Sequence, residues 1–213
     1  MDLTWLGHGC IRMRGRETTI LCDPCSKDTG YNIGRQAADI VTLSHDHPAH
    51  SNVAVVSGHP KVIAGPGEYE VGGALIIGVR TYHDAQSGAL RGKNTAYLIE
   101  IDGTRVCHLG DIGHLPSEQQ IEQLVGADIL VVPVGGGTTI DAQVAARTVS
   151  LLEPRIVVPV HYATPASRVE GLDGVERFLK EMGVTDVTPE SKISTGRGGV
   201  SGETRTVVLE YRA

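Results

Sequence analysis

Three histidines and an aspartate fall within six positions of the segment LSHDHPAHSN, residues 43–52, and this cluster constrains the fold more than any other feature. The segment overlaps the end of a continuous apolar run, ADIVTLS, which is typical of a buried strand. Side chains alternate between the faces of a strand, so His45 and His47 are expected on one side of the backbone. His50 follows a short turn, and three imidazoles this close together favour metal binding.

Three further strands are predicted to end in a histidine or an aspartate. His83 closes ALIIGVRTYH, Asp111 follows RVCHLG, and His161 closes RIVVPVH. A single histidine at a sheet edge is more often a satisfied structural residue than a ligand. Four separate strands that each deliver a potential ligand at the same end indicate a common site, because functional side chains gather in loops at strand ends.

The order of the predicted elements indicates an α/β fold in one domain, residues 1–213. Short strand-like runs come first, and the Asp-Gly pair at 102–103 predicts a two-residue hairpin. After residue 115, strands alternate with helices. The helical segments are LPSEQQIEQLVG, TTIDAQVAARTVSLLEP and LDGVERFLKEMG. This order favours two mixed sheets packed face to face with helices outside them.

Composition restricts the class of partner. The chain carries a formal net charge of −6 with interspersed acidic and basic residues, so nucleic acid is not expected as a partner. The N-terminal segment lacks signal-peptide features, and no apolar run is long enough to span a membrane. Four cysteines are too few for a disulfide scaffold, which favours a cytoplasmic location.

The successive motifs TWLGHGC, LCDP, LSHDHPAH, HLGD and VPVH resemble those of the metallo-β-lactamase superfamily, and the resemblance spans essentially the whole chain. More narrowly, the chain resembles the small, single-domain members of the ascorbate-6-phosphate lactonase-like branch. The resemblance implies a four-layer αβ/βα sandwich of two mixed sheets flanked by helices. It also implies a metal-dependent hydrolase with one or two Zn²⁺ ions, for which Mn²⁺ or Fe²⁺ could substitute.

The resemblance further implies a role for each motif residue. Asp111 would bridge two ions and would be catalytic, since such a pair holds a hydroxide and polarises the bond under attack. The ligands of the first ion would be His45, His47 and His83, and those of the second would be His50 and His161.

One position departs from the family motif HxHxDH, because Ala49 stands where the motif has an aspartate. That aspartate normally binds the second ion and orients the attacking water. Asp84, beside His83, is a candidate replacement. Three interpretations stay open: a weakened hydrolase with two ions, an enzyme with one ion, or a relative that binds a metal or ligand without catalysis.

Several residues are predicted to lie on the substrate side. His8, in LGHGC, is expected to contact substrate or to support a ligand, and Arg91 and Asn94 belong to a basic loop near the site. The glycines of GGGTTID, residues 135–141, could expose backbone N–H groups to an anion, although a capped strand-to-helix turn is the more common arrangement. We therefore expect the protein to hydrolyse a small anionic ester, lactone or phosphoester. We expect no membrane partner, and an oligomer is possible.

Overall fold

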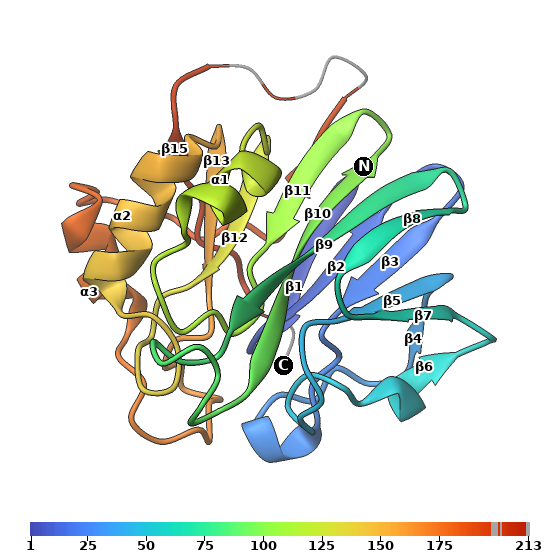
Figure 1. The fold of residues 1–213 in the computed structure, drawn as a ribbon, viewed down its shortest axis with the longest axis horizontal. Helices are drawn as coiled ribbons and strands as arrows, with labels where there is room; N and C mark the ends of the chain where they lie inside the picture. Colours follow the sequence, from blue (N-terminus) through green and yellow to red (C-terminus); the bar gives the residue numbers. More distant parts are fainter. Residues whose placement is uncertain (197–199, 201, 212–213) are drawn as a thin grey trace.

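The structure is a computed structural model that describes residues 1–196, 200 and 202–211. Two large β-sheets pack face to face in it (Figure 1). Within the described residues, the first sheet has the strand order β14-β1-β2-β3-β5-β7, and the second has the order β15-β13-β12-β11-β10-β9-β8. A small third sheet pairs β4 with β6. The α/β sandwich predicted from the sequence is confirmed.

The first sheet contains β1 (Asp2–Gly7), β2 (Cys10–Arg14), β3 (Thr19–Cys22), β5 (Ile40–Leu43), β7 (Lys61–Ala64) and β14 (Ile193–Ser194). The second contains β8 (Gly67–Val71), β9 (Ala74–Tyr82), β10 (Lys93–Ile101), β11 (Thr104–His108), β12 (Ile129–Pro133), β13 (Ile156–Val160) and β15 (Arg205–Thr206). The remaining elements are β4 (Gln36–Ala37), β6 (Val56–Ser57), the 3₁₀ turns η1 (Lys27–Thr29) and η2 (Val53–Val55), and the helices α1 (Glu118–Leu124), α2 (Ala142–Leu152) and α3 (Val175–Glu181).

Both large sheets are mixed. β1, β2 and β3 are antiparallel, whereas β3, β5 and β7 are parallel. In the second sheet β8 to β11 form an antiparallel meander, and β11, β12, β13 and β15 run parallel. The predicted hairpin is confirmed, since Ile101 pairs with Thr104 and both Asp102 and Gly103 have positive φ. The change from meander to strand–helix alternation follows the sequence pattern.

The alternation of side chains along the first sheet creates two apolar clusters. Trp5, Ile11 and Ile20 belong to the core shared with the second sheet, whereas Leu6 and Leu21 belong to a second cluster on the opposite face. The segments around η1 and η2 cover that second cluster. Loops and 3₁₀ turns thus form the outer layer over the first sheet, where the four-layer pattern led us to expect helices.

The three α-helices lie together beside the second sheet (Figure 1), where α1 contacts β9 and α2 contacts β12. The starts of α1 and α2 follow capping residues in the sequence. Ser117 and Gln120 form a reciprocal capping box at α1, and the carboxylate of Asp141 accepts a hydrogen bond from Val144 N at the start of α2. The positions of the helices could therefore be predicted from the local sequence. The sheet that the helices cover could not be predicted in this way.

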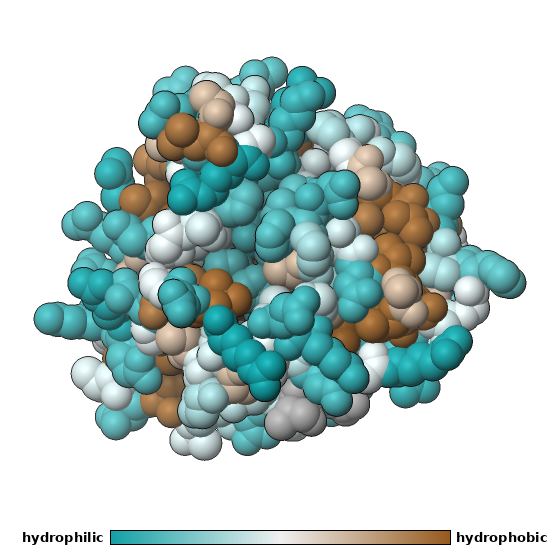
Figure 2. All heavy atoms as spheres, turned by 90° about the horizontal axis from the view of Figure 1, so that it is seen from below, coloured by the Kyte–Doolittle hydropathy of each residue, from teal (hydrophilic) through white to brown (hydrophobic). Residues whose placement is uncertain are grey.

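The surface seen from below is mainly hydrophilic, with apolar residues in separate patches (Figure 2). Among the described residues, no helix has the length and apolar character needed to cross a bilayer.

Tyr97 of β10 ties the second sheet to the first. Its side chain is fully buried, and its hydroxyl accepts a hydrogen bond from the backbone N–H of Gly65 at 2.9 Å. The same hydroxyl donates to the carbonyl of Leu43 at 2.8 Å. Leu43 lies just before the histidine-rich loop, residues 45–50. The contact therefore fixes the end of β5, from which that loop begins.

We expect Tyr97→Phe to lower the free energy of unfolding by about 1–3 kcal/mol, because two partly buried backbone groups would lose their partner, the N–H of Gly65 and the carbonyl of Leu43. Urea denaturation measures this change. The matched control is Tyr69→Phe, whose half-buried hydroxyl makes only 3.3 Å contacts at the sheet edge. It should change stability by less than about 0.5 kcal/mol. Equal losses in the two variants would contradict the role assigned to Tyr97.

Candidate metal centre

The potential ligands come from the ends of five strands and meet at one cavity. His8 follows β1, the loop with His45 and His50 follows β5, and His83 follows β9. Asp111 and His161 follow β11 and β13. The cavity has a volume of about 380 Å³, which suits a small molecule. Its lining residues are His8, His45, Asp46, His47, Ala49, His50, His83, Arg91, Asp111, Thr138, His161 and Val169.

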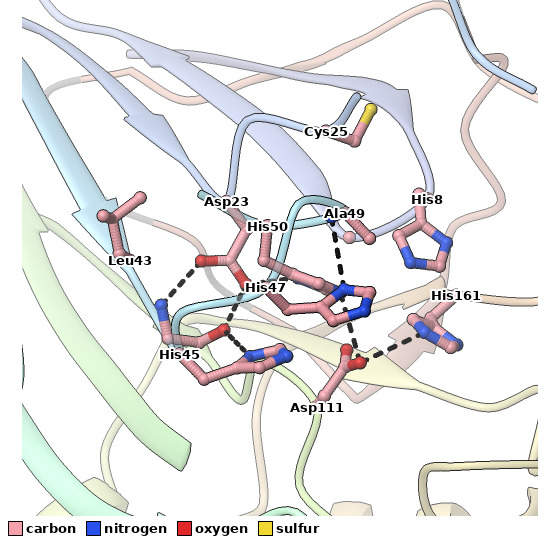
Figure 3. A network of polar contacts seen from close by, with 12 residues as sticks. His8, Asp23, Cys25, Leu43, His45, His47, Ala49, His50, Asp111 and His161 are labelled. Atoms are coloured by element: carbon pink, nitrogen blue, oxygen red, sulfur yellow. Dashed lines mark hydrogen bonds and ion pairs between the residues drawn. The ribbon is translucent and has the colours of Figure 1, made fainter. Parts of the chain in front are cut away.

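These side chains form two compact groups. In each group, one potential ligand atom from every residue lies within 4.8 Å of the others. One group contains His45, His83 and Asp111, and the other contains His8, His50 and His161. Each group combines residues from both sheets, so the site is built across the sandwich (Figure 3).

Asp111 lies at the centre of the ligands. Its Oδ2 atom is 3.1 Å from Nε2 of His50, 3.3 Å from Nε2 of His161 and 3.4 Å from Nε2 of His83. Its backbone N–H donates to Oδ1 of Asn94 at 3.0 Å. The Asn94 amide in turn donates to Thr81 Oγ1 and to the carbonyl of Leu109. Asn94 thus fixes the loop that presents Asp111.

Asp23 supports His50 from the side opposite Asp111. Its fully buried carboxylate is 2.9 Å from Nδ1 of His50 and accepts hydrogen bonds from the backbone N–H and hydroxyl of Ser44 (Figure 3). A carboxylate behind an imidazole fixes the ring orientation and raises its basicity. Asp23 is therefore a positioning residue for a metal-binding histidine.

Burial and local charge give the site residues the protonation states that metal ligands need. Burial lowers the pKa of His8 well below its usual value, and burial with the nearby charge of His50 lowers the pKa of His45 to about 4. For Asp111, burial alone would raise the pKa, but the surrounding histidines, His161 and His50 foremost, hold it well below its usual value. The two imidazoles are thus neutral and the carboxylate is ionised near pH 7.

His50 differs from these imidazoles. Burial by itself disfavours its charged form, but the carboxylates of Asp111 and Asp23 outweigh burial and raise its pKa to about 10. The space between the two carboxylates therefore attracts positive charge, which an ion or a proton can supply.

Unpaired polar atoms also point to a cation. Oδ1 of Asp111, Nδ1 of His83 and Nδ1 of His161 are buried and have no hydrogen-bond partner in the described structure, and Nε2 of His50 has only its ion pair with Asp111. Buried polar atoms are almost always paired, so these four atoms around one cavity need an explanation. Imidazole and carboxylate are ligands for zinc and similar ions, and the residues present fit such a group.

Three residues of the site have left-handed backbone conformations. The φ angles of His8, Asp23 and His161 are 51°, 47° and 53°. Each of these residues directly follows the last residue of a strand. A non-glycine residue in this region costs about 1–2 kcal/mol, and such strain gathers at functional sites. The turns therefore hold these side chains at a cost to local stability.

The structure corrects one prediction of the sequence and leaves another untested. Asn94 was expected on the substrate side; it is 1% exposed and its amide is engaged within the protein, and it lines a neighbouring cavity, so its role on the substrate side stays a prediction. Asp84 was a candidate ligand, but its carboxylate accepts four backbone hydrogen bonds from Gln86, Gly88, Leu90 and Arg91. Burial opposes ionisation of Asp84, yet these donors lower its pKa to about 2. Asp84 organises its loop.

Other predicted residues reach the cavity. Arg91 is exposed and lines it, in agreement with a role on the substrate side, which stays a prediction. His47 also lines it but is exposed and lies outside both compact groups, with its Nδ1 accepting a hydrogen bond from Ala49 N. Its role as a ligand stays a prediction. Ala49 is 7% exposed and places a methyl group on the cavity wall.

The glycine-rich segment 135–141 is a capped turn. Asp141 occupies the start of α2 as its N-cap, which leaves this helix end less suited to an anion. Thr138 of the same segment lines the cavity and could contact a substrate.

Asp23 was missed from the sequence as a positioning residue. The motif LCDP was noted only for its place at a strand end, and no local pattern shows that its carboxylate reaches His50. The contact depends on the packing of the β3 end beside the β5 end in the parallel part of the sheet.

We expect Asp23→Asn to weaken metal binding about 10–100-fold, because an amide cannot supply the charge that orients His50 and keeps it basic. Competition for Zn²⁺ with a chromophoric chelator measures the affinity. Asp39→Asn is the matched control, since Asp39 is exposed and, among the described residues, its side chain accepts a hydrogen bond only from the backbone N–H of Thr19, away from the cavity. Unchanged affinity in Asp23→Asn would contradict the assigned role.

Comparison with known proteins agrees with this geometry. The family profile described as "Beta-lactamase superfamily domain" matches residues 2–161, which include every residue of both ligand groups. A UPF0173 protein of Pyrococcus furiosus is 31% identical and aligns with 85% of this chain and 90% of its own length. A protein of Methanoregula boonei, named UPF0173 metal-dependent hydrolase, is 26% identical, with 77% of this chain and 83% of that protein covered.

A crystal structure from Thermotoga maritima, provisionally described as a Zn-dependent hydrolase of the metallo-beta-lactamase superfamily, has 34% sequence identity and a TM-score of 0.82. The alignment covers 99% of both chains. The agreement of the profile, the relatives and the fold shows that this chain belongs to the metallo-β-lactamase superfamily.

Proposed function

We propose that the protein is a metal-dependent hydrolase of small anionic esters, lactones or phosphoesters. The observation that carries the proposal is the pair of three-residue ligand groups on one cavity wall, His45–His83–Asp111 and His8–His50–His161. The name of the Methanoregula boonei relative and the description of the Thermotoga maritima structure support metal dependence and hydrolysis.

Bound ions would act as Lewis acids that activate a water molecule and polarise the bond to be broken. The protein would hold them through the buried, unpaired carboxylate oxygen of Asp111 and the histidines around it. Imidazole-rich sites suit zinc, so Zn²⁺ is our preferred cofactor, with Fe²⁺ or Mn²⁺ as alternatives.

Residues of the chain itself would orient the substrate. Arg91 provides a positive charge at the cavity, which favours an anionic group on the substrate. The loop that carries Arg91 is held by Asp84, which fixes the backbone from which this side chain extends. Thr138 offers a hydroxyl on the same wall. Together these residues support recognition of a phosphate or carboxylate beside the scissile bond.

A neighbouring cavity of about 500 Å³ supports a substrate that extends beyond the ligands. His45 and Asp46 line both cavities. Arg80 and Lys93 add two basic side chains to the second cavity, which again favours an anion. The four cysteines are free, in keeping with a reducing, cytoplasmic setting.

We expect the protein to bind Zn²⁺ and to hydrolyse at least one member of a panel of nitrophenyl phosphoesters, carboxylic esters and lactones. Asp111→Asn should lower the rate by about 100-fold or more, because its carboxylate faces three of the potential ligands. Elemental analysis and initial rates test this. Asp186→Asn, an exposed aspartate, is the control and should retain full activity. Less than one ion per chain in the unmutated protein would overturn the proposal.

A second candidate function is metal or ligand binding without catalysis, which Ala49 favours. The buried methyl group leaves the cavity without the carboxylate that normally orients the attacking water.

The variant Ala49→Asp separates the two functions. For a weakened hydrolase, we expect measurable hydrolysis in the unmutated protein and a faster rate in Ala49→Asp, since a second carboxylate restores water orientation. For a binding protein, we expect ions to bind while neither form hydrolyses the panel. Rates measured at saturating Zn²⁺ distinguish these results from a difference in metal content.

A further inference from the structure

His8 belongs to the site although it is not part of the histidine-rich loop, residues 45–50. It follows β1, far from that loop in sequence, yet its ring centroid is 4.1 Å from that of His161 and 5.0 Å from that of His50. All three side chains are at most 2% exposed. The three rings form a compact group that opens onto the cavity.

The backbone of His8 is held firmly in its strained turn. Its carbonyl accepts a hydrogen bond from the Trp5 indole at 2.8 Å and another from the backbone N–H of His161 at 3.1 Å. Gly9 follows, and a Cβ built there would lie 3.0 Å from the His50 ring. These contacts hold the His8 segment against two other members of its group, one from each sheet.

The ring of His8 has no hydrogen-bond partner in the described part of the chain, although the residue is 2% exposed. Neither of its ring nitrogens is among the fully enclosed polar atoms without a partner, which agrees with its place on the cavity wall. His108, outside the cavity lining, is also buried; its Nε2 contacts the carbonyl of Gly9 at 2.9 Å, and its Nδ1 has no partner in the described structure. The unpartnered ring of His8 lines the cavity and is available to a ligand there.

Ala49 lines the cavity together with His8 and His50, and all three are labelled in Figure 3. On the basis of the metal-dependent function proposed above, we propose that His8, His50 and His161 bind one ion, with His8 as the third ligand in place of a carboxylate at position 49. The sequence departure at Ala49 is then a change of ligand, and the site keeps its capacity for a second ion.

The use of the His8 imidazole in place of a carboxylate at position 49 changes which ions this site prefers. A carboxylate is a hard, charged ligand, whereas a neutral imidazole is a borderline one. A site made of three imidazoles favours Zn²⁺ or Co²⁺ and disfavours Mn²⁺, which prefers oxygen ligands. With a neutral imidazole in place of an aspartate at position 49, the loaded centre would carry one more positive charge. That charge favours an anionic substrate.

Equilibrium dialysis against Co²⁺, with elemental analysis and the visible absorption spectrum of the bound ion, tests the proposal without an activity assay. The unmutated protein should bind two ions. His8→Gly should lose the second ion or bind it more than about 100-fold more weakly. Glycine is chosen because it adopts the left-handed backbone at position 8 without strain. His8→Ala gives a second test, and circular dichroism checks the fold of both variants.

The double variant His8→Gly/Ala49→Asp should regain the second ion and bind Mn²⁺ more tightly relative to Zn²⁺ than the unmutated protein does. A purely structural role for His8 would give no such recovery. His59→Ala is the matched control, because His59 is an exposed histidine outside both ligand groups. It should leave two ions bound.

The outcomes are distinguishable. Two ions of unchanged affinity in His8→Gly would overturn the role of His8 and leave the proposed function intact. One ion in the unmutated protein would also overturn it, since the second group would then not bind. No ion in the unmutated protein would overturn the proposed function itself.

Discussion

The carboxylate of Asp111 is the group around which the site is organised. It lies within 3.4 Å of histidines from three other strand ends, and burial makes its negative charge costly unless positive charge is close. Those histidines come from both sheets, so the sandwich must pack correctly before the charge is balanced. The buried, unpaired oxygen of Asp111 shows that protein contacts alone do not complete this balance. A cation would complete it, and the surrounding histidines are placed where they could bind one.

A layer of buried polar contacts holds the ligands in place. Asn94 fixes the Asp111 loop, Asp23 fixes His50, and Tyr97 fixes the end of β5. Each of these residues uses its side-chain polar atoms in contacts within the protein. The positions of the ligands therefore depend on the packing of both sheets, whereas Arg91 reaches the cavity from an exposed loop.

Much of this arrangement could be predicted from the sequence, because strand periodicity and strand ends are local features. The sandwich, the 102–103 hairpin, and the gathering of His45, His50, His83, Asp111 and His161 at one site followed from such patterns. Contacts between distant strands were not readable. No local pattern indicated that the Asn94 amide would hold the Asp111 loop, that Asp23 would reach His50, or that Asp84 would bind its own loop. Likewise, periodicity could not show that loops would replace helices over the first sheet.

Because each ligand group contains residues from both sheets, a bound ion would cross-link parts of the polypeptide chain that are distant in sequence. The second group would close a loop that runs from residue 8 to residue 161. In the chain-entropy description, a disulfide that closes a loop of roughly 100 residues lowers the conformational entropy of the unfolded chain. This stabilises the folded state by about 4–5 kcal/mol. A metal link is reversible, so the sheets could separate only after the ion departs. The lifetime of the folded molecule would then follow the rate of ion exchange as well as the strength of its apolar core.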